Sequence, residues 1–296
     1  MTTGTLDAPP SSVCVICGSR NVAGAGQCPD CFAPLALTRD GLTTPREPTF
    51  VTVLGDSNVG KTVYLGFLLD MLSQRAGDFE AIPVGPYSVD VQQNVISHMA
   101  YRVFPPKTPT EADQWNWAYY QIAQGRGKRR KVVDLVMPDL AGEALAAEVA
   151  APETFRIIRR LIDRSAGMLL LLDAALAAQG SSQPDFCGLK ALTYIDAART
   201  AGRSRRVQTP IAVVLCKSDL CPECYDNPRR FAQANLTRLW NLCESRFANV
   251  AFFACGVVGS LGYAAGGEDE PVVPIPLHTA LQGVLEPFQW VMDRVQ

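Results

Sequence analysis

Residues 55–62 read GDSNVGKT and match the phosphate-binding pattern G-x-x-x-x-G-K-[ST] without a mismatch. Apolar runs at 50–54 and 63–72 flank them, which predicts a buried strand before the loop and a helix after it. In that setting backbone N–H groups and the helix N-terminus hold a phosphate chain, Lys61 reaches its terminal phosphates, and the Thr62 hydroxyl takes one position on Mg²⁺. The residues expected at this site are Gly55, Asp56, Ser57, Asn58, Val59, Gly60, Lys61 and Thr62.

A second group of candidate residues, DLAGE at 139–143, follows the strand-like run 131–137. A carboxylate at the carboxyl end of a strand can hold Mg²⁺ directly or through water, which is the role expected of Asp139. The backbone amide of Gly142 could then contact a γ-phosphate. The alternative interpretation is an ordinary turn after a strand. The order of the two groups along the chain favours function.

The third group, CKSD at 216–219, directly follows the apolar run 211–215. A carboxylate here can accept hydrogen bonds from both the ring N–H and the exocyclic amine of guanine, and adenine offers no such pair of donors. This chemistry favours guanine as the base recognised by Asp219. The stem of Lys217 can lie along the base plane. The segment 254–256 follows the last expected strand and could contact the base through its backbone amides.

These groups, in this order, resemble the Ras-like P-loop GTPases of the translation-factor-related (TRAFAC) class over about residues 46–296. In that class the base-recognition pattern is Asn/Thr-Lys-x-Asp, which Lys217 and Asp219 match. Cys216 departs from it: the family's Asn braces the phosphate loop by hydrogen bonds, and a thiol is a poor substitute. Among the members of the class, the chain looks most like bacterial GTPases of the double-GTPase type, which are often found beside defence or signalling operons.

The resemblance implies roles for further residues. The catalytic residues it indicates are Lys61, Glu143 and a switch threonine, for which Thr108 is preferred over Thr110. Glu143 stands where Ras-like proteins have a Gln that orients the attacking water, so intrinsic hydrolysis of GTP is expected to be slow and any acceleration to come from a partner or from assembly. Asn58 either helps to bind K⁺, as in some members of the class, or simply caps the loop.

Four cysteines form two C-x-x-C pairs that lie ten residues apart near the N-terminus. Four thiolates at this spacing can surround one Zn²⁺ in a closed tetrahedral shell, which makes the ion structural and not catalytic. Two disulfides or a redox pair are the alternatives, and neither suits a cytosolic chain without a βαβ pattern around the cysteines. The segment closely resembles bacterial zinc ribbons. The expected ligands are Cys14, Cys17, Cys28 and Cys31.

Strand-like and helix-like runs alternate after the ribbon, which predicts an α/β fold with a mostly parallel sheet. The resemblance implies the three-layer Ras-like fold with one antiparallel hairpin, formed by 114–122 and 131–137, and an inserted segment at about 75–104. The expected domains are a zinc ribbon at 1–35, a linker at 36–48 and a GTPase domain at 49–296. Other strands are expected at 50–54, 168–172, 211–215 and 250–254, and helices at 61–75, 152–164, 188–201, 228–246 and 277–294.

The composition of the 296-residue chain favours a cytoplasmic protein. Its net charge of −2 gives no general attraction to nucleic acid, so nucleic acid is not the expected partner. The N-terminus lacks the features of a signal peptide. The longest apolar run, 166–178, is too short to span a bilayer and carries Asp173. From the motifs and the resemblance, the expected partners are GTP or GDP and an unidentified protein effector or operon partner.

Several other features are open to more than one interpretation. Cys221 and Cys224 form a third C-x-x-C pair that could bind metal with help from Cys187, Cys243 or a second chain, or could be a plain loop. Trp115 and Trp117 alternate with polar residues, as in a half-buried strand, and could equally face a partner. A basic run is either solvated surface or a docking site for an acidic partner: Arg126, Lys128, Arg129, Arg130 and Lys131. Two isolated histidines, His98 and His278, are expected to be structural.

Three functions fit these residues. The first is a GTP-hydrolysing switch whose ribbon recruits a partner. The second is a nucleotide-dependent scaffold that binds GTP stably with little turnover, which Glu143 and Cys216 favour somewhat. The third is an ATP-using P-loop protein, which requires Asp219 to be incidental.

Overall fold

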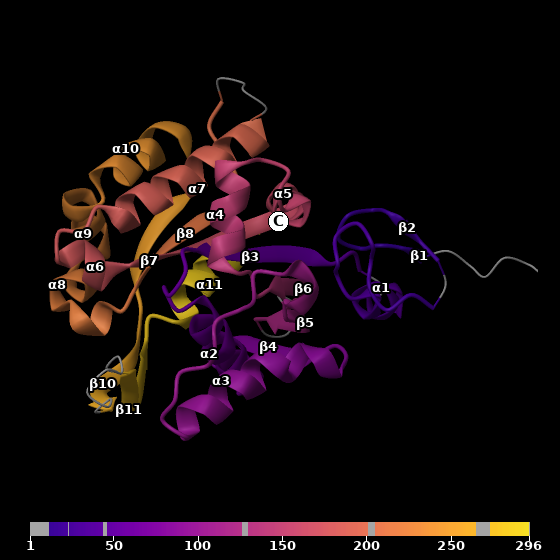
Figure 1. The fold of residues 1–296 in the computed structure, drawn as a ribbon, viewed down its shortest axis with the longest axis horizontal. Helices are drawn as coiled ribbons and strands as arrows, with labels where there is room; N and C mark the ends of the chain where they lie inside the picture. Colours follow the sequence, from indigo (N-terminus) through magenta and orange to yellow (C-terminus); the bar gives the residue numbers. More distant parts are fainter. Residues whose placement is uncertain are drawn as a thin grey trace, which may run out of the picture.

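The computed structural model describes residues 12–22, 24–43, 46–125, 130–200, 205–264 and 273–295. Its central element is a seven-stranded sheet with the strand order β4-β5-β6-β3-β7-β8-β9, covered by helices on both faces (Figure 1). The phosphate-loop strand β3 therefore lies in the middle of the sheet. The strands are β3 (Thr49–Gly55), β4 (Phe79–Pro83), β5 (Trp117–Gln124), β6 (Lys131–Pro138), β7 (Ser165–Asp173), β8 (Ile211–Cys216) and β9 (Val250–Ala254).

The sheet is parallel except around β5. The pairs β3·β6, β3·β7, β7·β8 and β8·β9 are parallel, whereas β5 pairs antiparallel with both β6 and β4. The expected hairpin is thus confirmed as β5–β6, and β4 from the inserted segment adds one more strand at that edge. Because parallel strands end at the same edge of a sheet, the loops after β3, β6, β7, β8 and β9 gather there.

The two faces of the sheet bury separate hydrophobic clusters. Successive side chains of a strand point to opposite faces, so Phe50 and Leu54 of β3 join one cluster while Val51 and Val53 join the other. Helices α2, α3 and α11 cover the face of Val51 and Val53, and α4, α5, α7, α9 and α10 cover the opposite face. The helices are α1 (Leu35–Thr43), α2 (Lys61–Ser73), α3 (Asp90–Ala100), α4 (Gly142–Ala150), α5 (Arg156–Arg164), α6 (Ala174–Ala178), α7 (Gln183–Thr200), α8 (Pro222–Asp226), α9 (Pro228–Asn235), α10 (Thr237–Arg246) and α11 (Leu285–Met292).

The expected helix at 277–294 is wrong in its first part. Strand β11 (Val273–Gln282) pairs there with β10 (Gly256–Ala264) in a separate two-stranded sheet. Gly283, at φ 64°, ends the strand, and a Cβ on it would lie 1.8 Å from the carbonyl oxygen of Ala254. The helix that follows is α11. The hairpin β10–β11 projects from the sheet beside the loop after β9 (Figure 1).

Three further helical expectations need adjustment. The expected helix at 228–246 is two helices, α9 and α10, that meet at Leu236. The expected helix at 152–164 begins only at Arg156, because Glu153 takes a left-handed φ of 77°. Helix α4 was not expected at all. It begins at Gly142, within the segment that the sequence assigned to phosphate contacts.

The N-terminal unit packs against the rest of the molecule. Helix α1 occupies much of the segment expected to be a linker, and Leu35 and Leu37 are buried in the cluster that contains Phe50. The Arg164 guanidinium lies 5.0 Å above the Phe50 ring and donates to the carbonyl of Ile16 at 3.4 Å. The short strands β1 (Ser12–Val13) and β2 (Arg20–Asn21) complete the unit.

The two tryptophans at the start of β5 and just before it are core residues. Trp115 and Trp117 are both buried, so they present no surface to a partner. The Trp115 indole donates to the carbonyl of Pro109 at 3.0 Å and its ring stacks on Phe155. This contact fixes the loop that precedes β5.

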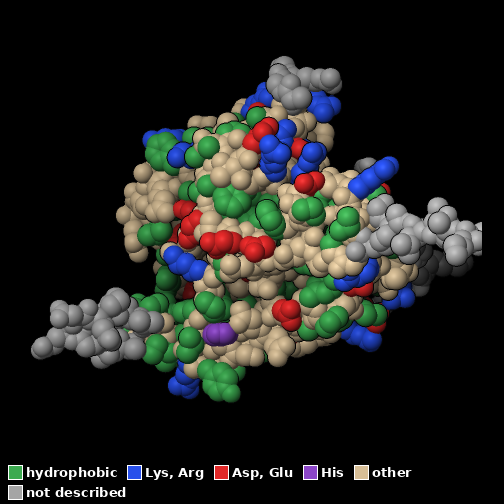
Figure 2. All heavy atoms as spheres, turned by 45° about the vertical axis from the view of Figure 1, so that its right-hand side comes forward, with side chains coloured by type: hydrophobic (Ala, Val, Ile, Leu, Met, Phe, Trp, Pro, Cys, Tyr) green, Lys and Arg blue, Asp and Glu red, His purple; other side chains and the backbone are tan. Residues whose placement is uncertain are grey.

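The face of the molecule drawn in Figure 2 shows no dominant charge. Figure 2 shows one face of the molecule, on which acidic, basic and hydrophobic side chains are interspersed. Arg130 is paired with Glu80 at 3.0 Å, and Arg126, Lys128 and Arg129 of the basic run lie outside the described residues. Within the described ranges, no helix has both the length and the apolar character needed to cross a membrane.

Candidate nucleotide-binding site

The loop 55–60 joins β3 to α2 in a conformation that needs small residues. Gly60 has a φ of 96°, which an L side chain rarely adopts, and Asn58 has a φ of 62°. A Cβ on Gly55 would lie 2.7 Å from the carbonyl oxygen of Leu171 on the neighbouring strand β7. The glycines of the pattern therefore shape the loop that precedes the N-terminus of α2.

Lys61 folds back over this loop. Its ammonium donates to the carbonyl of Asp56 at 2.7 Å, and only 8% of the residue is exposed. Burial lowers its pKa, and the nearby carboxylates of Asp139, Glu143 and Asp56 oppose that shift. A buried cation at the mouth of a phosphate loop can neutralise phosphate charge in a low-dielectric setting.

Three oxygen-bearing side chains meet beside Lys61. The Thr62 hydroxyl lies 2.9 Å from the Thr108 hydroxyl and 3.1 Å from a carboxylate oxygen of Asp139, and Thr108 donates to Asp139 at 2.9 Å. Asp139 is 1% exposed, and its burial raises its pKa against the hydrogen bonds from the two threonines and the charge of Lys61. Two hydroxyls and a carboxylate are ligands that suit Mg²⁺, so the donor set fits this ion.

The start of α4 touches the phosphate loop. A Cβ on Gly142 would lie 2.3 Å from the backbone nitrogen of Ser57, so only glycine permits this approach. Next to it, Glu143 accepts a hydrogen bond from the Ser57 hydroxyl at 2.5 Å, and the Lys107 ammonium lies 3.8 Å away. The hydrogen bond from Ser57 lowers the pKa of the exposed Glu143 carboxyl.

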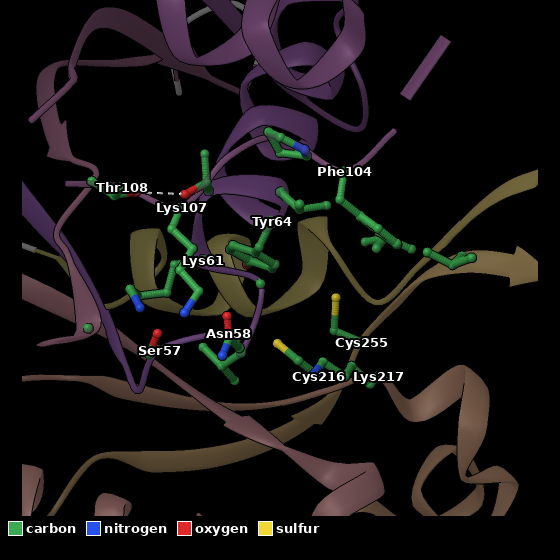
Figure 3. A pocket seen from close by; sticks show the side chains of 18 of the residues that line it. Ser57, Asn58, Lys61, Tyr64, Phe104, Lys107, Thr108, Cys216, Lys217 and Cys255 are labelled. Atoms are coloured by element: carbon green, nitrogen blue, oxygen red, sulfur yellow. Dashed lines mark hydrogen bonds between the residues drawn. The ribbon is translucent and has the colours of Figure 1, made fainter. Parts of the chain in front are cut away.

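A cavity of about 510 Å³ runs from the phosphate loop to the hairpin β10–β11. Figure 3 shows Lys61 and Thr108 towards one end, and Cys216, Lys217 and Cys255 towards the other. Asp219 lines this second end, and burial raises its pKa. Gly256 lies against it: a Cβ there would be 3.1 Å from the Cβ of Asp219 and 2.0 Å from the Tyr225 hydroxyl. Apolar side chains form much of the remaining wall: Val63, Phe104, Leu220, Val257, Val258, Leu261 and Pro274.

Comparison with known sequence families gives a match over residues 49–258 to the family described as Double-GTPase 2. The chain belongs to the Double-GTPase 2 family. The matched range contains the phosphate loop, Thr108, Asp139, Gly142 and Asp219, and the fold is that of a P-loop GTPase. The ribbon and most of the hairpin β10–β11 lie outside it.

The chain is similar to several solved structures, among them the following three. Nucleolar GTP-binding protein 1 from Plasmodium falciparum is 8% identical with a TM-score of 0.43, over 86% of this chain and 89% of that chain. Roco2 of Methanosarcina barkeri bound to GDP is 15% identical with a TM-score of 0.34, over 72% of this chain and 44% of that chain. The signal recognition particle receptor complex from Chaetomium thermophilum is 16% identical with a TM-score of 0.39, over 73% and 93%. Comparison with curated protein sequences gives no match.

In this member of the Double-GTPase 2 family, Cys216 does not brace the phosphate loop. Its sulfur points into the cavity, as does that of Cys255 on the neighbouring strand end (Figure 3). A hydrogen bond with Cys255, together with burial, raises the pKa of Cys216. Among the described residues, no hydrogen bond joins the Cys216 side chain to the phosphate loop.

Some contacts at the site could not be predicted from the pattern alone. Asp56 accepts hydrogen bonds from Gln183 at 2.9 Å and from the Cys187 thiol at 3.0 Å, which ties the phosphate loop to α7. Tyr64 is buried in the first turn of α2 and donates to the carbonyl of Val284 at 2.8 Å. Asp173 pairs with Lys217 at 2.6 Å. The position of Asp173 at the end of an apolar run was the one available signal.

The remaining candidate residues lie outside the cavity or lack, in the part of the chain that the structure describes, the further ligands that a metal site would need. Among the described residues, Cys221 and Cys224 belong to no group of three or more metal-ligand residues. Cys224 accepts a hydrogen bond from the Ser218 hydroxyl at 3.3 Å. His98 is bonded to the carbonyl of Asn94 on α3, and Thr110 is exposed. Cys243 is a buried residue of α10 and, among the described residues, belongs to no such metal-ligand group either.

The four N-terminal cysteines form a group whose ligand atoms all lie within 4.8 Å of one another. The Sγ atoms of Cys14 and Cys31 are 3.6 Å apart, and those of Cys17 and Cys28 are 3.5 Å apart. A tetrahedron with Zn–S bonds of about 2.3 Å has edges of about 3.8 Å, so these separations suit four thiolates around one Zn²⁺.

Proposed function

We propose that this chain binds Mg²⁺–GTP, hydrolyses it slowly and acts as a molecular switch. The observation that carries the proposal is the meeting of Thr62, Thr108 and Asp139 at one end of a cavity whose other end holds Asp219. The phosphate-loop match and the family support the same activity. Cytoplasmic location accords with ten cysteines that are all free of disulfides.

The proposed division of labour follows from the geometry. Residues 55–62 hold the phosphates through backbone N–H groups, with the Lys61 ammonium over the terminal phosphates. Thr62, Thr108 and Asp139 hold Mg²⁺, which neutralises phosphate charge when bound. Asp219 accepts the paired donors of guanine. Asn58 lines the cavity near the phosphates, where K⁺ could also bind.

Slow turnover follows from the position of Glu143. A carboxylate near the γ-phosphate repels its charge and cannot donate a hydrogen bond to the phosphate while it is ionised. The hydrogen bond from Ser57 lowers its pKa, which keeps it ionised. This same contact favours the second candidate function, a scaffold that binds GTP stably with little turnover.

We further propose that the molecule comprises a ribbon (1–35), a connecting segment (36–48) and a GTPase domain (49–296), and that the ribbon docks a protein partner. A closed Cys₄ shell leaves no open position for catalysis at zinc. The ribbon also exposes large apolar side chains, with Val22 75% exposed and Val13 and Phe32 about half exposed. Exposed apolar groups of this size are candidates for contact with a partner.

The decisive experiment is titration of the nucleotide-free protein with GTP and ATP analogues in Mg²⁺. We expect tight GTP binding that Asp219→Ala removes, and weak ATP binding in both proteins. Asp226→Ala, at an exposed carboxylate on α8, is the matched control and should bind GTP like the wild type. Equal ATP binding that does not depend on Asp219 would establish the ATP-using alternative instead.

A further inference from the structure

The base end of the cavity is held by an ion pair that reaches outside the base-recognition segment. The Lys217 ammonium lies 2.6 Å from a carboxylate oxygen of Asp173, whose side chain is 10% exposed against 40% for Lys217. Asp173 is the last residue of β7 and pairs in register with Cys216, the last residue of β8. The pair therefore links the ends of two neighbouring parallel strands.

The segment 216–219 needs such a link. Lys217 has a left-handed backbone, with φ 59° and ψ 30°, which an L residue adopts only at a cost in free energy. The thiol of Cys216 points into the cavity (Figure 3) and is a poor hydrogen-bonding group. On the other side, Ser218 is buried and its backbone N–H donates to the carbonyl of Cys255 at 3.1 Å. This contact fixes Ser218 but leaves the Lys217 side chain to be placed by another group.

We propose that Asp173 is a positioning residue for base recognition. By holding the Lys217 ammonium, it lays the lysine stem along the cavity wall and keeps the turn that presents Asp219. The pair of Asp173 and Lys217 thus holds the base-recognition turn, to which the Cys216 thiol contributes little hydrogen bonding. The inference rests on the proposed function, because it concerns the binding of a guanine nucleotide at this cavity.

Asp173 has a second contact that makes a sharp test possible. Its other carboxylate oxygen accepts from the backbone N–H of Leu176 at 2.9 Å and so caps α6. Asn caps a helix about as well as Asp, whereas Ala does not. Asp173→Asn therefore removes the charge and keeps the cap, and Asp173→Ala removes both. A difference between the two variants separates the ion pair from the local stability of the chain.

The experiment measures the affinity and dissociation rate of a fluorescent GDP for the full chain in Mg²⁺. We expect Asp173→Asn and Lys217→Met each to weaken binding about tenfold, since contacting residues share coupling energies of this size. The double variant should bind GDP less than about twofold more weakly than Lys217→Met alone. The difference in GDP affinity between the wild type and these variants should shrink as the salt concentration rises, because Lys217 is partly exposed. Asp196→Asn, which breaks a similar pair with Arg246 on the far helices, is the control and should change binding little.

Other outcomes would overturn the inference. If Asp173→Asn binds GDP with wild-type affinity, the charge of Asp173 is not needed. The same conclusion follows if the losses of affinity in the two single variants multiply in the double variant. A weakening confined to Asp173→Ala, with a lowered thermal midpoint of the nucleotide-free protein, would assign Asp173 to the cap alone. The proposed function fails separately, if the wild type binds no guanine nucleotide or if Asp219→Ala binds GDP as tightly as the wild type.

Discussion

The two ends of the nucleotide cavity are built in different ways. At the phosphate end, polar side chains from three segments of the chain already contact one another: Thr62, Thr108 and Asp139 form one hydrogen-bonded group, and Ser57 holds Glu143. At the base end the wall is mostly apolar, and part of it comes from the hairpin β10–β11, most of which lies outside the range matched to the family. Asp219 is the chief polar group there.

This difference reflects how each part of a nucleotide is recognised. Phosphates are bound by backbone N–H groups and fixed charges, whose spacing allows little variation. A base is recognised by a few donors and acceptors within a cavity of suitable shape, so the surrounding wall can vary. The phosphate loop accordingly matches G-x-x-x-x-G-K-[ST] in full, whereas the base end has Cys216 at the first position of the expected Asn/Thr-Lys-x-Asp pattern.

The largest effect should come from changing Asp219, the carboxylate that lines the base end. Asp219→Asn replaces one acceptor by a donor, so guanine loses a hydrogen bond and meets a second donor. Xanthine, with a carbonyl in place of the guanine amine, matches the amide. We expect GTP affinity to fall on the order of 100-fold and XTP to bind better than GTP, measured by competition against a fluorescent nucleotide.

Asp226→Asn is the control for this exchange, because Asp226 is exposed on α8 and should leave both affinities unchanged. If Asp219→Asn keeps its preference for GTP, the apolar wall and not the carboxylate selects the base. The contrast between the two ends would then have to be redrawn, with shape as the main determinant at the base end.

The next effect concerns protons at the phosphate end. Burial raises the pKa of Asp139 in the nucleotide-free protein, so a proton competes with Mg²⁺ at a pH above the ordinary aspartate range. As pH falls through that raised pKa, the contribution of Mg²⁺ to GTP affinity should decline by at most about tenfold per pH unit. Titrations with and without Mg²⁺ across the acid range would measure it. In Asp139→Asn the pH dependence of the Mg²⁺ contribution should disappear, and its persistence would place the titrating group elsewhere.

The sequence predicts these two ends unequally for a physical reason. The phosphate loop, Asp139 and the central strands are specified by local patterns, namely glycine spacing and apolar runs. Thr108 could be chosen only through the family resemblance, and the structure does bring it to Thr62. The expected helix at 277–294 wrongly included the last residues of β11, because the partner strand β10 lies outside that segment and no local pattern shows the pairing. The ion pair of Asp173 with Lys217 joins residues 44 apart, which no local pattern reveals.

A smaller effect should follow from Glu143, the residue of the phosphate end that departs from the family pattern. Glu143→Gln removes the negative charge near the γ-phosphate and supplies an amide that can orient water. We expect single-turnover GTP hydrolysis to become roughly tenfold faster, with nucleotide affinity nearly unchanged. Glu153→Gln, at an exposed carboxylate after α4, is the matched control. An unchanged rate in Glu143→Gln would mean that Glu143 does not reach the attacking water.

Changes in the ribbon should have the smallest effect on nucleotide affinity. They test whether the two ends of the cavity are independent of the ribbon. Removal of Zn²⁺ with a chelator, or Cys14→Ser, should unfold residues of the ribbon, because metal binding supplies on the order of 10 kcal/mol of folding free energy to such a unit. The ribbon buries Leu35 and Leu37 against the cluster that contains Phe50, so the thermal midpoint should fall. GDP affinity should nonetheless change by less than about twofold, since no ribbon residue lines the cavity within the described chain. Cys243→Ser, at a cysteine outside the ribbon, is the control and should retain its zinc content. A large loss of GDP affinity on removal of zinc would show instead that the ribbon is coupled to β3 and, through it, to the phosphate loop.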